Sequence, residues 1–135
     1  MGRVQKMAID LRLLHGLPVV CIDVVFAGRQ LHMENVLLDT GSAGTILDAD
    51  RVADIGVRPE GTDRTAIIHG VGGTEIVFTK WFDTVVLGDW AVNKCKIEIG
   101  AMDYGIAIDG ILGFDFMRAA GLIIDTNRMQ VYSTN

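Results

Sequence analysis

Hydrophobic residues along this chain fall into short runs of β-strand length, separated by turns that contain glycine. Residues 19–26 (VVCIDVVF) are almost continuously apolar, and residues 27–30 (AGRQ) then offer a turn into residues 31–38. An apolar run, a glycine turn and a second apolar run predict a β-hairpin. The predicted hairpin ends directly before Asp39.

Further strands are predicted in the second half of the chain. Residues 74–82 and 84–87 are rich in β-branched and aromatic side chains, and a turn is expected at residues 88–89. Residues 94–99 then alternate strictly, with Cys95, Ile97 and Ile99 on one side and charged residues on the other. This alternation predicts a sheet with one buried and one solvated face.

Two short helices have recognisable ends. Asp48 or Asp50 is a suitable N-cap for a segment that carries Val52 and Ile55, and Gly56 suits the left-handed residue after its last turn. Asp115 is predicted to cap a second helix over residues 116–120 that stops at Gly121. A strand at residues 122–124, a turn at 125–128 and a strand at 129–132 are expected to follow.

Length and composition add limits to this picture. A chain of 135 residues has room for one domain, so we expect residues 1–135 to form a single domain, with residues 1–14 as a peripheral segment. The formal net charge of −5 disfavours a nucleic-acid partner, because nucleic-acid binding needs clustered cations. The two cysteines, Cys21 and Cys95, are expected to be small core residues.

The apolar runs are shorter than the roughly 20 residues of a membrane span, and the first 14 residues lack the apolar core of a signal peptide. We therefore expect no membrane segment and a soluble protein. The compartment is unknown, and the missing signal favours the cytoplasm.

One acid, Asp39, lies in a turn at the end of an apolar strand, a position where catalytic residues are often found. Asp39 follows two leucines, so its carboxylate leaves a buried strand and enters a tight turn at Gly41. The second half of the chain repeats this context in weaker form: if Gly41 and Gly113 correspond, Asp39 aligns with Ile111. The second half therefore supplies an apolar residue where the first supplies a carboxylate.

Four features in order resemble the retropepsin-like aspartic proteases, nearer their cellular and bacterial branch than their viral one. They are Gly16-Leu17-Pro18, the run Leu37-Leu38-Asp39-Thr40-Gly41-Ser42, the segment His69-Gly70-Val71-Gly72-Gly73, and Asp109-Gly110-Ile111-Leu112-Gly113. The resemblance spans roughly residues 17–132. It implies a mainly β fold, a closed acid-protease-like barrel lobe with one or two short helices and a flap hairpin.

The resemblance also implies an aspartic endopeptidase that works as a homodimer on peptide or unfolded protein substrates. Asp39, Thr40 and Gly41 match the catalytic motif, and Asp39 of a second subunit would complete a dyad. The substrate-binding positions implied by the resemblance are Ser42, Ile68, His69, Gly70, Val71, Gly72, Gly73 and Ile111. The family needs no cofactor, and the scattered histidines argue against a metal site.

Some alternatives stay open at this point. Asp109 and Asp125 are possible intrachain acids, although Asp125 is typical of an Asp-initiated turn and Asp109 of a structural position. A catalytically weak or inactive dimerisation or peptide-binding module on the same fold is the alternative function.

Two departures from the viral pattern carry expectations of their own. Viral members pair an Arg after the second glycine with an Asp beyond Asp-Thr-Gly, and Phe114 and Ala43 occupy these positions here. Both partners are absent together, so no charge is stranded. Ser42 replaces a common Ala, and a hydrogen bond from its hydroxyl to Asp39 would favour the ionised acid and an acidic working pH.

Overall fold

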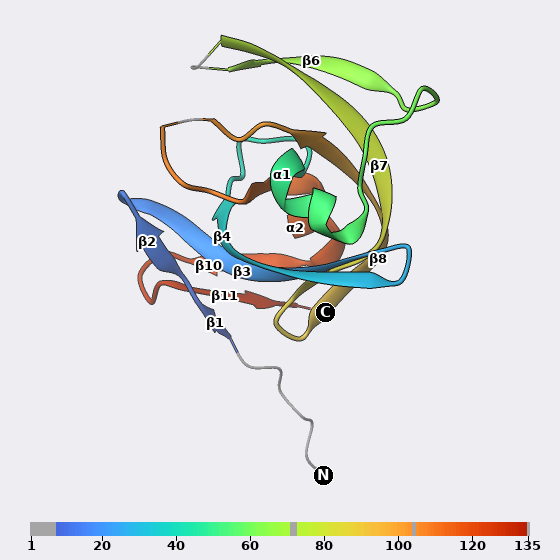
Figure 1. Cartoon of the computed structure of the whole chain (residues 1–135). Helices are drawn as coiled ribbons and strands as arrows, with labels where there is room; N and C mark the ends of the chain where they lie inside the picture. The colour runs from blue at the N-terminus through green and yellow to red at the C-terminus, as the bar shows by residue number, and fades with distance from the viewer. Residues whose placement is uncertain (1–7, 71–72, 104, 135) are drawn as a thin grey trace.

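The computed structural model describes residues 8–70, 73–103 and 105–134. It is mainly β, with two short α-helices and one 3₁₀ helix, which confirms the predicted fold class (Figure 1). The strands are β1 (Ile9–Asp10), β2 (Arg12–Leu14), β3 (Leu17–Phe26), β4 (Arg29–Leu38), β5 (Ile46–Asp48), β6 (Thr65–Gly70), β7 (Gly73–Leu87), β8 (Trp90–Gly100), β9 (Gly110–Leu112), β10 (Leu122–Asp125) and β11 (Gln130–Ser133). The helices are α1 (Ala49–Val52), η1 (Ala53–Ile55) and α2 (Phe114–Ala120).

Two sheets contain these strands. The larger has the order β2-β3-β4-β9-β5-β8-β7-β6, and an additional pairing joins β3 to β7, so the sheet curls back on itself. The smaller has the order β1-β11-β10. Residues 8–14, expected at the periphery, include β1, which pairs with β11, and Leu11, which is buried in the core. This described part of the N-terminal segment is therefore integrated into the lobe.

The predicted hairpin before Asp39 is confirmed as β3 and β4. Its turn is only two residues long, Ala27 and Gly28, which both have positive φ angles of 48° and 79°. Positive φ at both positions is the geometry of a type I′ turn, whose twist matches that of the strands. The hairpin delivers Asp39 to the end of a strand whose side chains Met33, Val36 and Leu38 are buried.

A single main core fills the curled sheet, and its fully buried side chains include Ile22, Met33, Leu47, Phe82, Ile99 and Leu112. In β8, Ile97 and Ile99 are buried while Lys94 and Lys96 are exposed, as the alternation predicts. Cys21 is exposed, contrary to expectation, because it alternates with the buried Val20 and Ile22 and therefore lies on the outer face of β3. The register shifts at this point, and two residues of β4, Glu34 and Asn35, lie opposite Cys21.

The first helix matches its predicted ends. Asp48 caps α1 by accepting a hydrogen bond from the Arg51 amide, and Gly56 ends η1 with φ +89°. For α2 the predicted stop at Gly121 is confirmed, with φ +64°. The predicted cap is wrong: α2 begins at Phe114 with Gly113 as N-cap. Asp115 lies in the first turn, where its carboxylate accepts a hydrogen bond from the Thr45 hydroxyl instead.

Candidate active site

Asp39 lies at the carboxyl end of β4, beside β9. Its backbone amide donates to the Leu112 carbonyl (3.1 Å), which extends the parallel pairing of Leu38 with Leu112 by one residue. The Asp39 side chain is half-buried. One carboxylate oxygen, Oδ1, accepts a hydrogen bond from the Gly41 amide at 2.9 Å. Among the described residues no other donor is hydrogen-bonded to this carboxylate, so its second oxygen is available for other contacts.

The loop that follows Asp39 is tight and internally bonded. The Ser42 amide donates to the Asp39 carbonyl (3.2 Å). The Ser42 hydroxyl donates to the Gly44 carbonyl (2.7 Å). Since a hydroxyl has one proton to donate, the predicted hydrogen bond from Ser42 to the Asp39 carboxylate is wrong in this structure. Thr40 is exposed and faces away from the core.

A second loop, around Gly113, interlocks with the first. The Phe114 amide donates to the Ser42 carbonyl (2.7 Å), and the Gly113 amide donates to the Thr45 hydroxyl (3.0 Å). Thr45 is only 2% exposed, and its hydroxyl donates in turn to Asp115. The two loops are those that the weak internal duplication relates. Their mutual hydrogen bonds fix the backbone on which Asp39 is mounted.

The other candidate acids have structural roles. Asp109 pairs with Arg51 (Nη1 to Oδ1, 2.9 Å) and accepts the Asn35 amide on its other oxygen (3.1 Å). Asp125 accepts the Arg128 amide (2.9 Å), which is the predicted Asp-initiated turn. No hydrogen bond joins Asp39 to a second acid within the described ranges. Of the three candidate acids, only Asp39 is left with a carboxylate oxygen that makes neither a hydrogen bond nor an ion pair with the described residues.

A small apolar cluster lies apart from the main core. Its buried members are Ile46, Met102 and Ile108, and the half-buried side chains packed against them are Leu14, Leu37, Ile68, Ile106 and Ile111. Two predicted substrate-binding residues, Ile68 and Ile111, are therefore brought together here, although 43 residues separate them in the sequence. Because Leu37 and Ile111 lie side by side on β4 and β9, this cluster adjoins the strand that ends at Asp39.

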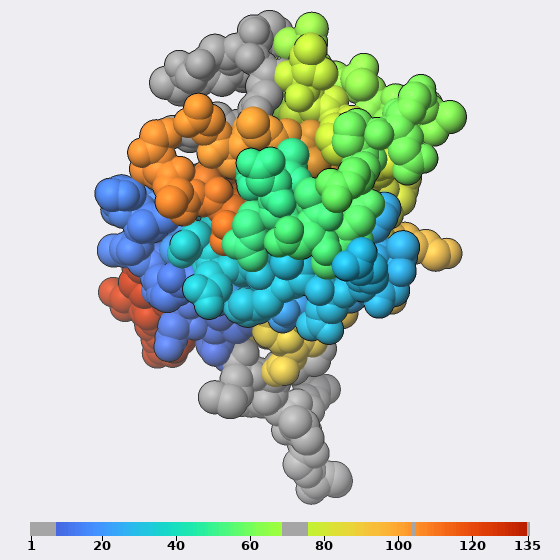
Figure 2. All heavy atoms as spheres, in the orientation of Figure 1, coloured from blue at the N-terminus to red at the C-terminus, as the bar shows by residue number. Residues whose placement is uncertain are grey.

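The hairpin of β6 and β7 extends from the body on the side of the segment that precedes β9 (Figure 1). In Figure 2 its green and yellow atoms lie next to the orange atoms of that segment. The backbones of His69, Gly70 and Gly73 belong to this hairpin. Val71 and Gly72, also predicted to bind substrate, lie outside the described residues.

The base of this hairpin is fastened by a buried charge that sequence analysis missed. Lys80 of β7 is 7% exposed, and its Nζ lies 3.0 Å from both Glu60 and Asp63. Burial alone would lower the pKa of Lys80, but the hydrogen bonds and charges of the two acids outweigh it and raise the pKa. The Glu60 amide, followed by Lys80, lowers the pKa of Asp63.

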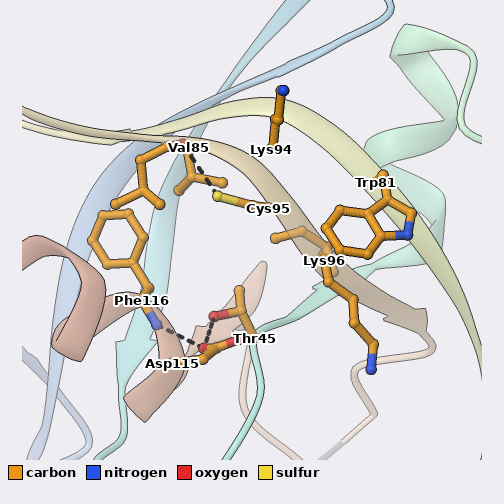
Figure 3. A pocket seen from close by; sticks show the side chains of 10 residues that line it. Thr45, Trp81, Val85, Lys94, Cys95, Lys96, Asp115 and Phe116 are labelled. Atoms are coloured by element: carbon orange, nitrogen blue, oxygen red, sulfur yellow. Dashed lines mark hydrogen bonds between the residues drawn. The ribbon is translucent and has the colours of Figure 1, made fainter.

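A cavity of about 240 Å³ lies between β8 and the start of α2 (Figure 3). Its wall includes Cys95, Phe116 and Asp115, and the exposed Trp81 flanks it. Burial raises the pKa of the Cys95 thiol, so the reactive thiolate is scarce. The Asp115 carboxylate is already bonded to Thr45. These side chains hold the fold together and offer no free nucleophile or acid pair.

Residues 8–70, 73–103 and 105–134 contain no cluster of three or more His, Cys, Asp or Glu side chains able to hold a metal ion. The same residues contain no helix with the length and apolar composition of a membrane span.

Comparison with known proteins gives a family match and a structural match. The family model described as "Aspartyl protease" matches residues 22–116, which include β4, the Asp39 loop, β9 and the start of α2. The search of curated proteins finds no match. Among solved structures, a retropepsin-like aspartic protease from Rickettsia conorii matches with a TM-score of 0.66 and 18% identity, over 96% of this chain and 100% of that one.

The structural match shows a shared fold, and the family match covers well over half of the residues. With its retropepsin-like fold and its Asp-Thr-Gly loop, this chain belongs to the aspartyl protease family.

Proposed function

We propose that this protein is an aspartic endopeptidase that hydrolyses peptide bonds as a homodimer, with Asp39 of each subunit forming one catalytic dyad. The observation that carries the proposal is the state of Asp39. Its carboxylate is half-buried at the end of a rigid strand, and one donor, the Gly41 amide, holds one of its oxygens. A purely structural acid would be bonded on both oxygens, as Asp109 is.

The chemistry needs a second carboxylate. Two carboxylates about 3 Å apart share one proton and titrate as a coupled pair. The ionised member can take a proton from a water molecule between them while the protonated member hydrogen-bonds the oxygen of the scissile carbonyl. Attack by that water gives a tetrahedral diol, which breaks down to the two peptide products without a covalent enzyme intermediate. Ile111 occupies the matching position of the second half, so a second chain has to supply the acid.

The other site residues follow from where they lie. Gly41 orients the Asp39 carboxylate through its amide, and Thr40, exposed beside it, is placed to meet the second subunit. The half-buried Ile68 and Ile111 offer an apolar wall for substrate side chains. We assign the β6–β7 hairpin, residues 68–73, the role of a flap whose backbone pairs with an extended peptide and excludes water. Ser42 stabilises the loop through the hydrogen bond that its hydroxyl donates to the Gly44 carbonyl.

Peptide-library cleavage over a pH series tests this function. The wild-type chain should cleave, a statine-type transition-state mimic should block cleavage, and Asp39→Asn should lower the rate by about 10²–10⁴-fold, the range that general acid–base catalysis contributes. Asp109→Asn is the matched control, because that acid holds Arg51 and the Asn35 amide rather than substrate. A fully active Asp39→Asn protein would sink the mechanism. A wild-type dimer that binds peptides without cleaving them would instead favour a peptide-binding module.

A further inference from the structure

A second cavity lies directly beside the Asp39 loop. Its volume is about 250 Å³, and its wall is mostly apolar. The residues that line it are Thr40, Phe114, Met117, Arg118, Gly121, Leu122 and Ile124. Thr40 is the residue after Asp39, so the cavity opens on the face that a second catalytic subunit has to cover.

Phe114 stands at the rim of this cavity with little packing of its own. It is the first residue of α2, and the inward face of that helix is formed by Phe116, Met117 and Ala120, which are buried. Phe114 lies one turn before Met117 and Arg118, beside this inward face, and is 51% exposed. Together with the apolar wall of the cavity, the half-exposed Phe114 ring forms a contiguous apolar patch, and such patches mark interaction sites.

The strand that forms the opposite wall is also open to a partner. β10 pairs with β11 along one edge, and within the described residues no strand pairs with its other edge. Leu122 and Ile124 of β10 line the cavity. One face of the molecule therefore carries the Asp39 loop, the Phe114 side chain, the cavity between them and the unpaired edge of β10.

We infer that Phe114 of each subunit inserts into this cavity of the other subunit and locks the catalytic dimer. The inference rests on the proposed function, which requires a second copy at Thr40. In a two-fold dimer the same surface patch of both subunits is in contact. The Phe114 side chain of each subunit can therefore enter the cavity of the other, which gives two equivalent contacts. This occupant is favoured over an unrelated protein because the dyad already demands a copy of this chain at the neighbouring residue.

The size and chemistry of the hollow suit a phenyl ring. Apolar cavities of about 150 Å³ hold a benzene molecule, and this one is larger. Met117 supplies a polarizable thioether, which makes favourable contacts with aromatic rings. Arg118 at the rim can stack its guanidinium on the face of the partner's Phe114. The aromatic contact would stand where viral relatives use an ion pair.

Sedimentation equilibrium on the full chain tests the inference. Phe114→Asp should raise the dimer dissociation constant by about 100-fold or more, because a buried aromatic anchor is lost and two like charges are introduced near one axis. Activity per dimer should be unchanged at high protein concentration, since Phe114 is not among the proposed catalytic and substrate-binding residues. The circular dichroism spectrum of the diluted protein should match that of wild type. Trp81→Asp is the matched control: Trp81 is another aromatic residue, 64% exposed on β7, and its substitution should leave the dimer constant unchanged.

Photo-crosslinking provides a second test that does not depend on a destabilising charge. A benzoylphenylalanine placed at position 114 of an isotope-labelled chain, mixed with unlabelled chain, should crosslink to unlabelled peptides that contain Met117 or Leu122. Crosslinks confined to one isotope, or a Phe114→Asp protein with the wild-type dimer constant, would overturn the inference while leaving the shared dyad intact. A wild-type protein that is monomeric at every concentration would contradict the proposed function itself.

Discussion

At the scale of single residues, the site depends on how few bonds Asp39 makes and how many its neighbours make. Gly41 orients the carboxylate, while Ser42 bonds through its amide, carbonyl and hydroxyl to the two loops around it. Ser42 therefore stabilises the loop rather than the charge on Asp39.

Replacing Ser42 with Ala tests this assignment. The change removes the hydrogen bond to the Gly44 carbonyl and should lower the free energy of unfolding by about 1 kcal/mol, measured by urea denaturation. The acidic limb of the pH–activity profile should stay where it is in wild type. An upward shift of that limb would show that the hydroxyl reaches the Asp39 carboxylate in the active dimer.

Sequence analysis could identify those residues whose role follows from their neighbours in the chain. Asp39 could be found because it ends an apolar strand at an Asp-Thr-Gly turn, in the order of motifs that resembles a known family, and Asp125 because its turn is local. The apolar cluster of Ile46, Met102 and Ile108 was missed, because these residues come from three separate segments and only the folded sheet brings them together. The direction of the Ser42 hydroxyl was missed for a similar reason, since the position of the Gly44 carbonyl depends on the loop as a whole.

At the scale of elements, the two loops that carry the Asp39 and Gly113 motifs cross at close range. A Cβ atom on Gly113 would lie 2.1 Å from the Gly44 carbonyl oxygen and 3.0 Å from that of Ser42. Gly113 has an ordinary negative φ of −89°, so space rather than backbone conformation requires glycine here.

Gly113→Ala should therefore cost about 3 kcal/mol or more in unfolding free energy, because backbone atoms have to move apart to accept the methyl group. Gly61→Ala is the control: a Cβ there meets nothing within 4 Å, so the change should stay within about 0.5 kcal/mol of wild type. Thermal and urea unfolding measure the stability of both variants. Equal stabilities for the two variants would mean that the loops do not cross as tightly as described.

A second element-scale feature is the charged anchor at the base of the β6–β7 hairpin. The lowered pKa of Asp63 means that its folded form favours the carboxylate more than the unfolded chain does. This stabilisation is present above the ordinary pKa of an aspartate and is lost as the pH falls through the lowered one.

Unfolding measured from about pH 7 to about pH 2 should show this dependence. Asp63→Asn should be less stable than wild type at neutral pH, and the difference should shrink toward zero at the acid end. Gly61→Ala, in the same loop, changes no charge and should differ from wild type by a constant amount. A difference between Asp63→Asn and wild type that stays constant with pH would contradict the role assigned to the Asp63 carboxylate.

Element identities were largely predictable, and the errors have physical causes. The β3–β4 hairpin, the alternation of β8 and the glycine stops of both helices follow from local periodicity and φ requirements. The start of α2 and the exposure of Cys21 do not follow from local sequence. α2 begins two residues early because its first amides bond to the Asp39 loop, and Cys21 faces outward because it alternates with Val20 and Ile22, which the folded sheet buries.

At the scale of the whole molecule, the lobe carries the Asp39 loop, the β6–β7 hairpin and the apolar cavity beside Thr40. The family match and the structural match establish the family and the fold of the lobe. The central proposal is that two copies of the chain share one catalytic site through their Asp39 residues. A shared dyad makes activity depend on both subunits of each dimer.

Subunit mixing measures that dependence most directly. Wild-type chains at fixed concentration are equilibrated with a ninefold excess of Asp39→Asn chains, and cleavage is followed. If dimers form at random, only about one wild-type chain in ten finds a wild-type partner, so activity should fall to roughly one tenth. Activity that stays at the level of the wild-type chains alone would show that each subunit cleaves with its own acid and would contradict the shared Asp39 dyad.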